Sequence, residues 1–76
     1  MKYPNKEQIE MLKKTYPAGT ELELLAMDDK QAPPVGTVGT VDGIDDAGQI
    51  MMTWQSGSSL SLIPGVDSFR KVDAER

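Results

Sequence analysis

The chain has 76 residues and a formal net charge of −4, and it contains no cysteine and no histidine. Without cysteine there is no disulfide framework and no thiolate chemistry, and without histidine the commonest metal ligand and neutral-pH acid–base group are missing. No apolar stretch reaches the roughly 18 residues of a membrane span, and the first residues lack the apolar core of a signal peptide. We therefore expect a single domain over residues 1–76 that is soluble and cytoplasmic, with no membrane association.

The charges are unevenly distributed along the chain. Residues 1–16 carry a net +2, residues 17–69 carry eight acids against Lys30 alone for a net −7, and residues 70–76 carry +1. Binding to a phosphate backbone depends on lysine and arginine contacts, which the acidic middle of the chain nearly lacks. Direct binding to nucleic acid is therefore not expected.

Residues 5–15 are predicted to form an α-helix. Asn5 is a good N-cap, and Gln8 three residues later completes the pattern of a capping box. Apolar residues then recur at helical spacing on one face, and Pro17 ends the helix. A helix of about 11 residues is marginal alone in water, so we expect it to dock within its own chain.

Residues 18–72 predict a small SH3-like barrel of five antiparallel strands, which makes the chain mainly β with one N-terminal helix. The predicted strands are 20–26, 37–44, 49–54, 59–63 and 69–72. In the first strand Leu22 and Leu24 alternate with glutamates, which is the pattern of a half-buried strand. Glycines interrupt the second strand, as they do where a small sheet bends. The tail at 73–76 is expected to fray.

The predicted interior combines apolar residues from all five strands. We expect it to contain Leu22, Leu24, Val38, Ile50, Met52, Leu60, Leu62 and Phe69. Between the strands, residues 45–48 predict a hairpin loop in which Gly48 is free to take a positive φ, and residues 64–67 predict a short helical turn.

Two acidic loops are candidate sites. Asp42, Asp45 and Asp46 could supply oxygen ligands to Ca²⁺ or Mg²⁺, but their spacing lacks the order of a calcium loop. Aspartates in a glycine hairpin usually bond to the turn itself, and we favour that interpretation. Asp28 and Asp29 precede two prolines and are expected to order their loop. Neither a metal nor another cofactor is therefore predicted.

Two side chains of the third predicted strand stand out. Trp54 is the only tryptophan and could stack on a proline-rich peptide, but its phase with Ile50 and Met52 favours a place in the core or at the strand end. Met51 has the opposite phase and is an apolar residue on the outer face. It is expected to lie under the N-terminal helix or to belong to a partner surface.

Three polar residues follow the turn at Pro64. Asp67, Ser68 and Arg70 could present polar groups to a ligand, with Asp28 and Asp29 nearby. We favour a structural interpretation, in which Asp67 or Ser68 caps the turn and Arg70 pairs with an acid.

Catalysis is not expected. A serine nucleophile needs a positioned base, which here would have to be a lysine, and Lys30 is the only lysine in residues 17–69. No glycine-rich loop carries the lysine and serine or threonine of a phosphate-binding motif.

Several segments together resemble one small bacterial and phage family, domain of unknown function 4314. They are Tyr16-Pro-Ala-Gly-Thr-Glu-Leu-Glu-Leu, Met27-Asp-Asp, Ala32-Pro-Pro-Val-Gly-Thr-Val-Gly-Thr-Val, Asp45-Asp-Ala-Gly, Trp54 and Leu62-Ile-Pro-Gly-Val-Asp-Ser-Phe. The resemblance covers roughly residues 16–72 and implies an SH3-like barrel in a bacterium, a phage or a conjugative element. It implies no activity and no functional residues.

The sequence thus predicts a non-catalytic module that binds an unidentified protein, as a monomer or weak homodimer. The candidate surface comprises Met51, Asp28, Asp29, Asp45, Asp46, Trp54, Asp67, Ser68 and Arg70. One alternative is an acidic inhibitor or decoy, encoded by a mobile element, that covers a nucleic-acid-binding surface of a host protein. A third is a KOW-like module associated with RNA or DNA, because the glycine–valine run before residue 42 loosely resembles such barrels.

Overall fold

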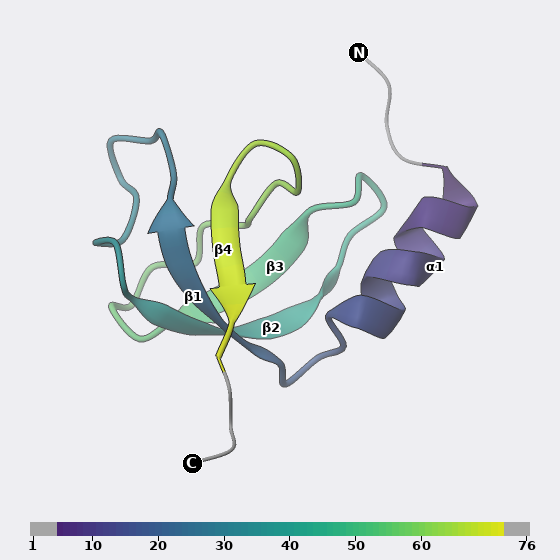
Figure 1. Cartoon of the computed structure of the whole chain (residues 1–76), viewed down its shortest axis with the longest axis horizontal. Helices are drawn as coiled ribbons and strands as arrows, with labels where there is room; N and C mark the ends of the chain where they lie inside the picture. Colours follow the sequence, from purple (N-terminus) through teal and green to yellow (C-terminus); the bar gives the residue numbers. More distant parts are fainter. Residues whose placement is uncertain (1–4, 73–76) are drawn as a thin grey trace.

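The computed structural model describes residues 5–72, which contain one helix and four strands. These elements are α1 (Lys6–Thr15), β1 (Glu21–Ala26), β2 (Val38–Ile44), β3 (Ile50–Trp54) and β4 (Ser68–Lys71). The strands form one antiparallel sheet in the order β3-β2-β1-β4, as Figure 1 shows. The mainly β fold with one helix is confirmed. The predicted number of five strands is wrong, because the described residues form four, and the sheet that they form is not closed. The predicted tail lies outside these residues.

The helix begins where its capping residues predict. The Asn5 side chain accepts a hydrogen bond from the backbone N–H of Gln8 at 2.8 Å, and the Gln8 side chain accepts one from Asn5 at 2.9 Å. Within the described part of the chain β2 is the only strand that α1 contacts, and no residue of the helix is fully buried. The helix is therefore docked on the sheet by a shallow contact at one side (Figure 1).

The hairpin between β2 and β3 is closed by local hydrogen bonds. The N–H of Asp45 donates to the carbonyl of Gln49 and the N–H of Gly48 donates to the carbonyl of Asp45, both at 3.0 Å. Gly48 has a φ of 82°, which L side chains rarely adopt, so glycine is required there. The turn at 54–58 repeats the same bonding pattern with another positive-φ glycine. The predicted hairpin loop at 45–48 is confirmed.

The predicted strand at 59–63 is wrong, although this segment does follow the free edge of β3. Leu62 and Ile50 exchange two backbone hydrogen bonds of 2.8 Å, which form an isolated bridge. Between that bridge and the turn, the carbonyl of Leu60 accepts a hydrogen bond from the indole Nε1 of Trp54 at 2.8 Å. In the middle of the segment the Leu60 carbonyl is therefore bonded to a side chain and not to the backbone of β3, so the strand ladder is interrupted there.

The core is a single cluster of buried apolar side chains. Its buried members are Leu22, Leu24, Val41, Ile50, Met52, Trp54 and Leu62. Five of the eight predicted residues are therefore buried, whereas Val38, Leu60 and Phe69 are only half-buried. In β2 it is Val41, paired with Met52, that faces inward, and Val38 has the opposite phase.

Candidate interaction surface

The outer face of the β2–β3 hairpin is shaped by a β-bulge. The pairing register shifts between Val41 and Gly43, so Asp42 is the extra residue of β2. Its Oδ2 atom accepts a hydrogen bond from the hydroxyl of Thr53 at 2.7 Å. We call Asp42, Gly43, Met51 and Thr53 the hairpin outer face. This cross-strand hydrogen bond holds the two polar residues of the hairpin outer face, Asp42 and Thr53, in place.

Met51 is the apolar residue of the hairpin outer face. Along β3 the side chains alternate strictly between buried and exposed, and Met51 is 43% exposed. Its partner in the ladder is Gly43, and a Cβ atom built on that glycine would have no atom within 4 Å. Neither α1 nor any residue beyond the two chain neighbours of Gly43 therefore takes the place of its missing side chain beside Met51.

A shallow groove lies where the end of α1 meets the end of β2. Its lining is almost entirely apolar, it is open to solvent, and its volume is about 340 Å³. The lining residues are Lys13, Tyr16, Pro17, Ala18, Gly43 and Ile44. The groove therefore borders the hairpin outer face at Gly43.

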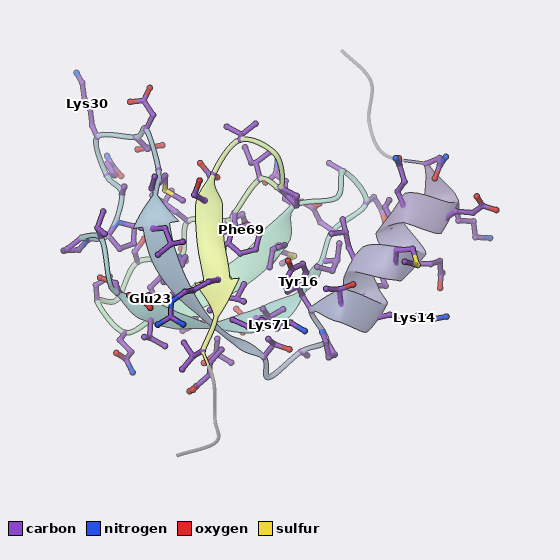
Figure 2. All side chains as sticks on the ribbon, in the orientation of Figure 1. Lys14, Tyr16, Glu23, Lys30, Phe69 and Lys71 are labelled. Atoms are coloured by element: carbon purple, nitrogen blue, oxygen red, sulfur yellow. The ribbon has the colours of Figure 1, made fainter. Side chains whose placement is uncertain are left out.

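Aromatic packing fixes one wall of this groove. The rings of Tyr16 and Phe69 meet edge to face, with centroids 5.5 Å apart and an interplanar angle of 71°. The Nζ atom of Lys71 lies 5.5 Å from the Tyr16 ring centroid, within the range of a cation–π contact. Figure 2 shows the three side chains gathered between α1 and β4, with Lys14 pointing away from the sheet.

The aspartates of the 45–48 hairpin have different roles. Asp45 is half-buried, and its Oδ1 atom accepts hydrogen bonds from the N–H groups of Ala47 at 3.0 Å and Gln49 at 2.8 Å. The prediction that Asp45 serves the turn is confirmed. Asp46 is exposed, and its carboxylate faces solvent at the tip.

The other acidic loop, residues 27–36, lies at the opposite end of β2 (Figure 1). Asp29 accepts a hydrogen bond from the N–H of Gln31 at 2.8 Å, so it orders the loop as predicted, while Asp28 is exposed. Lys30 extends from the loop tip in Figure 2. Because β2 separates the two acidic loops, the predicted candidate residues do not form one continuous surface.

Trp54 is not part of any surface. Its side chain is only 2% exposed and belongs to the core, so the interpretation of this residue as a core residue is confirmed. Its one polar atom is satisfied by the Leu60 carbonyl.

The turn before β4 is a β-turn rather than the predicted helical turn. The N–H of Val66 donates to the carbonyl of Ile63 at 3.0 Å, and Gly65 has a φ of 87°, the pattern of a type II turn. The Oδ2 atom of Asp67 accepts a hydrogen bond from the N–H of Ile63 at 2.8 Å, which confirms that Asp67 caps the turn.

The remaining two residues of this group lie on β4. Arg70 forms the predicted ion pair, and its partner is Glu23 of the neighbouring strand. Exposed pairs of this kind contribute about 0–1 kcal/mol. Ser68 is exposed at the start of the strand. We find no feature in the turn that sets these residues apart as a binding site.

The sequence did not indicate the groove. The glycines of the second predicted strand indicate only a bend, and the helical pattern indicates only where the helix ends. No local signal links them, because the end of α1 and the end of β2 meet only in the folded chain. Among residues 5–72, no group of three or more acidic side chains is placed to hold a metal ion. The helix of the described segment is too short to cross a membrane.

The fold and surface define a small mainly β domain with an open four-stranded sheet and one N-terminal helix. The chain belongs to the family described as domain of unknown function (DUF4314), whose model matches residues 5–72. The match begins at the N-cap Asn5, so α1 is part of the family domain, whereas the resemblance in the sequence began only at Tyr16. Neither the curated proteins nor the solved structures gave a significant match.

Proposed function

We propose that this chain is a non-catalytic protein-binding module, encoded by a bacterium or a mobile element, whose sheet is an open form of an SH3-like barrel. Its contact surface is the hairpin outer face. The proposal depends on one observation: Met51 is 43% exposed, although the other face of its strand β3 is fully buried.

The surroundings of Met51 suit a protein partner. Met adapts its shape to irregular apolar surfaces, and it is frequent at binding surfaces. The hydrogen bond between Thr53 and Asp42 and the closed 45–48 hairpin hold the polar neighbours rigid. A preorganised surface loses less conformational entropy when a partner binds.

Site-specific cross-linking tests this proposal. A photoreactive amino acid replaces Met51 in the full chain, expressed in its native host, and a matched variant carries it at Val66. Val66 is also apolar and is 71% exposed, but it lies in the turn before β4. We expect a discrete protein adduct from position 51 and not from position 66. Identical adducts from both positions, or none from position 51, would contradict the proposal.

An acidic decoy is the second candidate, because Asp42 and Asp45 are both fixed by hydrogen bonds on one hairpin. Fixed carboxylates can steer onto a basic surface, and the association rate then falls steeply with salt. The partner captured at position 51 distinguishes the two functions. A salt-dependent association rate that drops in Asp46→Asn supports the decoy, and a salt-independent rate excludes it.

A further inference from the structure

β4 is an edge strand of the sheet, and one of its two sides has no neighbouring strand. In the order β3-β2-β1-β4 only β1 lies beside it, and within the described part of the chain no other helix or strand contacts it. The opposite edge of the sheet is different, because Leu62 covers part of β3 through its two hydrogen bonds to Ile50. The free edge of β4 is the side that lies away from β1 in Figure 1.

The hydrogen-bond register shows which backbone groups face this free edge. The N–H of Val72 donates to the carbonyl of Glu21 at 2.9 Å, which makes Lys71 a member of a non-hydrogen-bonded pair with β1. Bonding alternates along an antiparallel pair, so Phe69 and Lys71 direct their N–H and carbonyl groups away from β1. The Lys71 carbonyl accepts a hydrogen bond from the guanidinium of Arg70 at 3.4 Å. The N–H and carbonyl of Phe69 and the N–H of Lys71 have no partner in the described part of the chain.

The side chains beside the free edge add a second requirement. Phe69 and Lys71 alternate with Arg70, so they share one face of the sheet. On that face Phe69 meets the Tyr16 ring edge to face, and Lys71 lies over the same ring (Figure 2). Arg70 lies on the other face, where it pairs with Glu23. A strand that adds to the edge therefore meets an apolar position beside Phe69 and a positive one beside Lys71.

We propose that the free edge of β4 binds an extended segment of a partner protein, antiparallel to β4, with an acidic residue beside Lys71 and an apolar residue beside Phe69. The added strand supplies partners for the unpaired backbone groups, which is how sheet edges recognise peptides. The antiparallel orientation continues the pairing of the sheet and fixes the order, because the acidic residue must precede the apolar one by two positions. This second surface goes beyond the proposed contact at the hairpin outer face, from which β1 separates it.

A second copy of the chain is a poor occupant of this edge. An antiparallel pair of β4 strands that used both outward positions would place each Phe69 opposite a Lys71. The two Arg70 side chains would then lie directly opposite each other, and like charges in that position destabilise a sheet. Charged side chains on an edge strand also hinder unspecific pairing. The occupant is therefore a segment of another protein.

Amide exchange and chemical shifts of the full ¹⁵N-labelled chain test the edge directly. The probe is the blocked heptapeptide Thr-Thr-Glu-Thr-Val-Thr-Thr. In the free chain the N–H groups of Phe69 and Lys71 should exchange faster than that of Arg70, which faces β1. We expect the peptide to shift all three amide signals and to slow exchange at Phe69 and Lys71 several-fold, because an added strand protects these two groups.

Two twins of the peptide separate strand addition from unspecific contact. Thr-Thr-Val-Thr-Glu-Thr-Thr has the same composition, but in the antiparallel orientation it places the acid beside Phe69 and the valine beside Lys71. The second twin carries methyl groups on the amide nitrogens of its valine and glutamate, so it keeps both side chains but cannot donate to the edge. The first twin should bind several-fold more weakly and the second at least about tenfold more weakly.

A charge reversal at Lys71 tests the side-chain requirement. Lys71 is exposed, so Lys71→Glu should fold. It should weaken binding of the glutamate peptide by about tenfold and favour Thr-Thr-Lys-Thr-Val-Thr-Thr instead. Lys14→Glu is the matched control, because it makes the same change of charge on a side chain that points away from the sheet (Figure 2). Its affinity for the glutamate peptide should match that of the unmodified chain.

Four results would overturn the inference. They are equal binding of the methylated twin, exchange at Phe69 and Lys71 that the glutamate peptide does not slow, equal losses in Lys71→Glu and Lys14→Glu, and shifts of the β4 amides that depend on protein concentration without peptide. The last result would indicate a second copy as the occupant. The cross-linking experiment at position 51 does not involve the β4 edge, so the proposed function can stand when this inference fails.

Discussion

The indole ring of Trp54 packs directly against the backbone of Gly39, its cross-strand partner in β2. A methyl group added at Gly39 would lie 2.6 Å from Cε3 and 2.8 Å from Cδ2 of the indole. It would also lie 3.0 Å from the terminal methyl carbon of Met52. The largest core side chain is thus accommodated by the absence of a side chain on the facing strand.

Gly39→Ala should destabilise the chain by about 1–3 kcal/mol, because overpacking forces Trp54 or β2 to move. Urea unfolding followed by tryptophan fluorescence measures this change. Gly43→Ala is the matched control in the same strand, and its effect should stay within about 1 kcal/mol and favour stability. Equal losses in the two variants would show that the close contact with Trp54 does not determine the cost.

Trp54→Phe should destabilise the chain by about 2–4 kcal/mol. The change leaves a cavity in the core and removes the hydrogen-bond donor that satisfies the Leu60 carbonyl. Because Leu60 lies in the segment along β3, amide exchange at Leu62 should accelerate more than exchange in β1. Urea unfolding monitored by circular dichroism gives the stability, and amide exchange gives the location. Uniform acceleration across the sheet would contradict a specific role for the indole N–H.

Asp45→Ala should cost about 1–2 kcal/mol in the free energy of unfolding, since the N–H groups of Ala47 and Gln49 lose their side-chain acceptor. Asp45→Asn keeps an acceptor oxygen and should restore most of the loss. Asp46→Ala, at the exposed neighbour, should stay within about 0.5 kcal/mol. Thermal or urea unfolding of the three variants provides the comparison. A loss at Asp46 as large as that at Asp45 would refute the assignment of the turn bonds.

Asn5→Ala should loosen α1 by about 1 kcal/mol while the sheet keeps its stability. The substitution removes the Asn5 side-chain acceptor for the N–H of Gln8 but keeps the backbone N–H that donates to the Gln8 side chain, and α1 contributes no fully buried residue to the core. Amide exchange at Ile9 and Leu12 should therefore accelerate several-fold, whereas exchange at Leu22 stays unchanged. A matching loss at Leu22 would mean that α1 and the sheet unfold as one unit.

Features that depend on neighbours in sequence were predictable. The start of α1 follows from Asn5 and Gln8, which bond to each other three residues apart. The hairpin at 45–48 follows from an aspartate and a glycine at its two ends. In both cases the bonding partners are close in the chain, so the local sequence contains the whole interaction.

The predictions failed where a group outside the segment decides how its backbone is paired. Residues 59–63 alternate like a strand, but the carbonyl of Leu60 bonds to the Trp54 indole instead of to the β3 backbone. The phase of β2 was also misjudged. Val41 is buried and Val38 is not, because pairing with β3 sets which side of the strand faces the core. Neither the pairing of residues 59–63 nor the phase of β2 can be inferred from the residues of that segment alone.

The sequence by itself determined the helix, the 45–48 hairpin, the acidic character of residues 17–69 and the membership in a family. Only the tertiary structure decided that the sheet stays open with four strands, that the two acidic loops lie at opposite ends of β2, and that a groove forms over Gly43. The physical reason is the range of the interactions. Turns and caps form within a few residues, whereas a groove exists only after the end of α1 has packed beside β2.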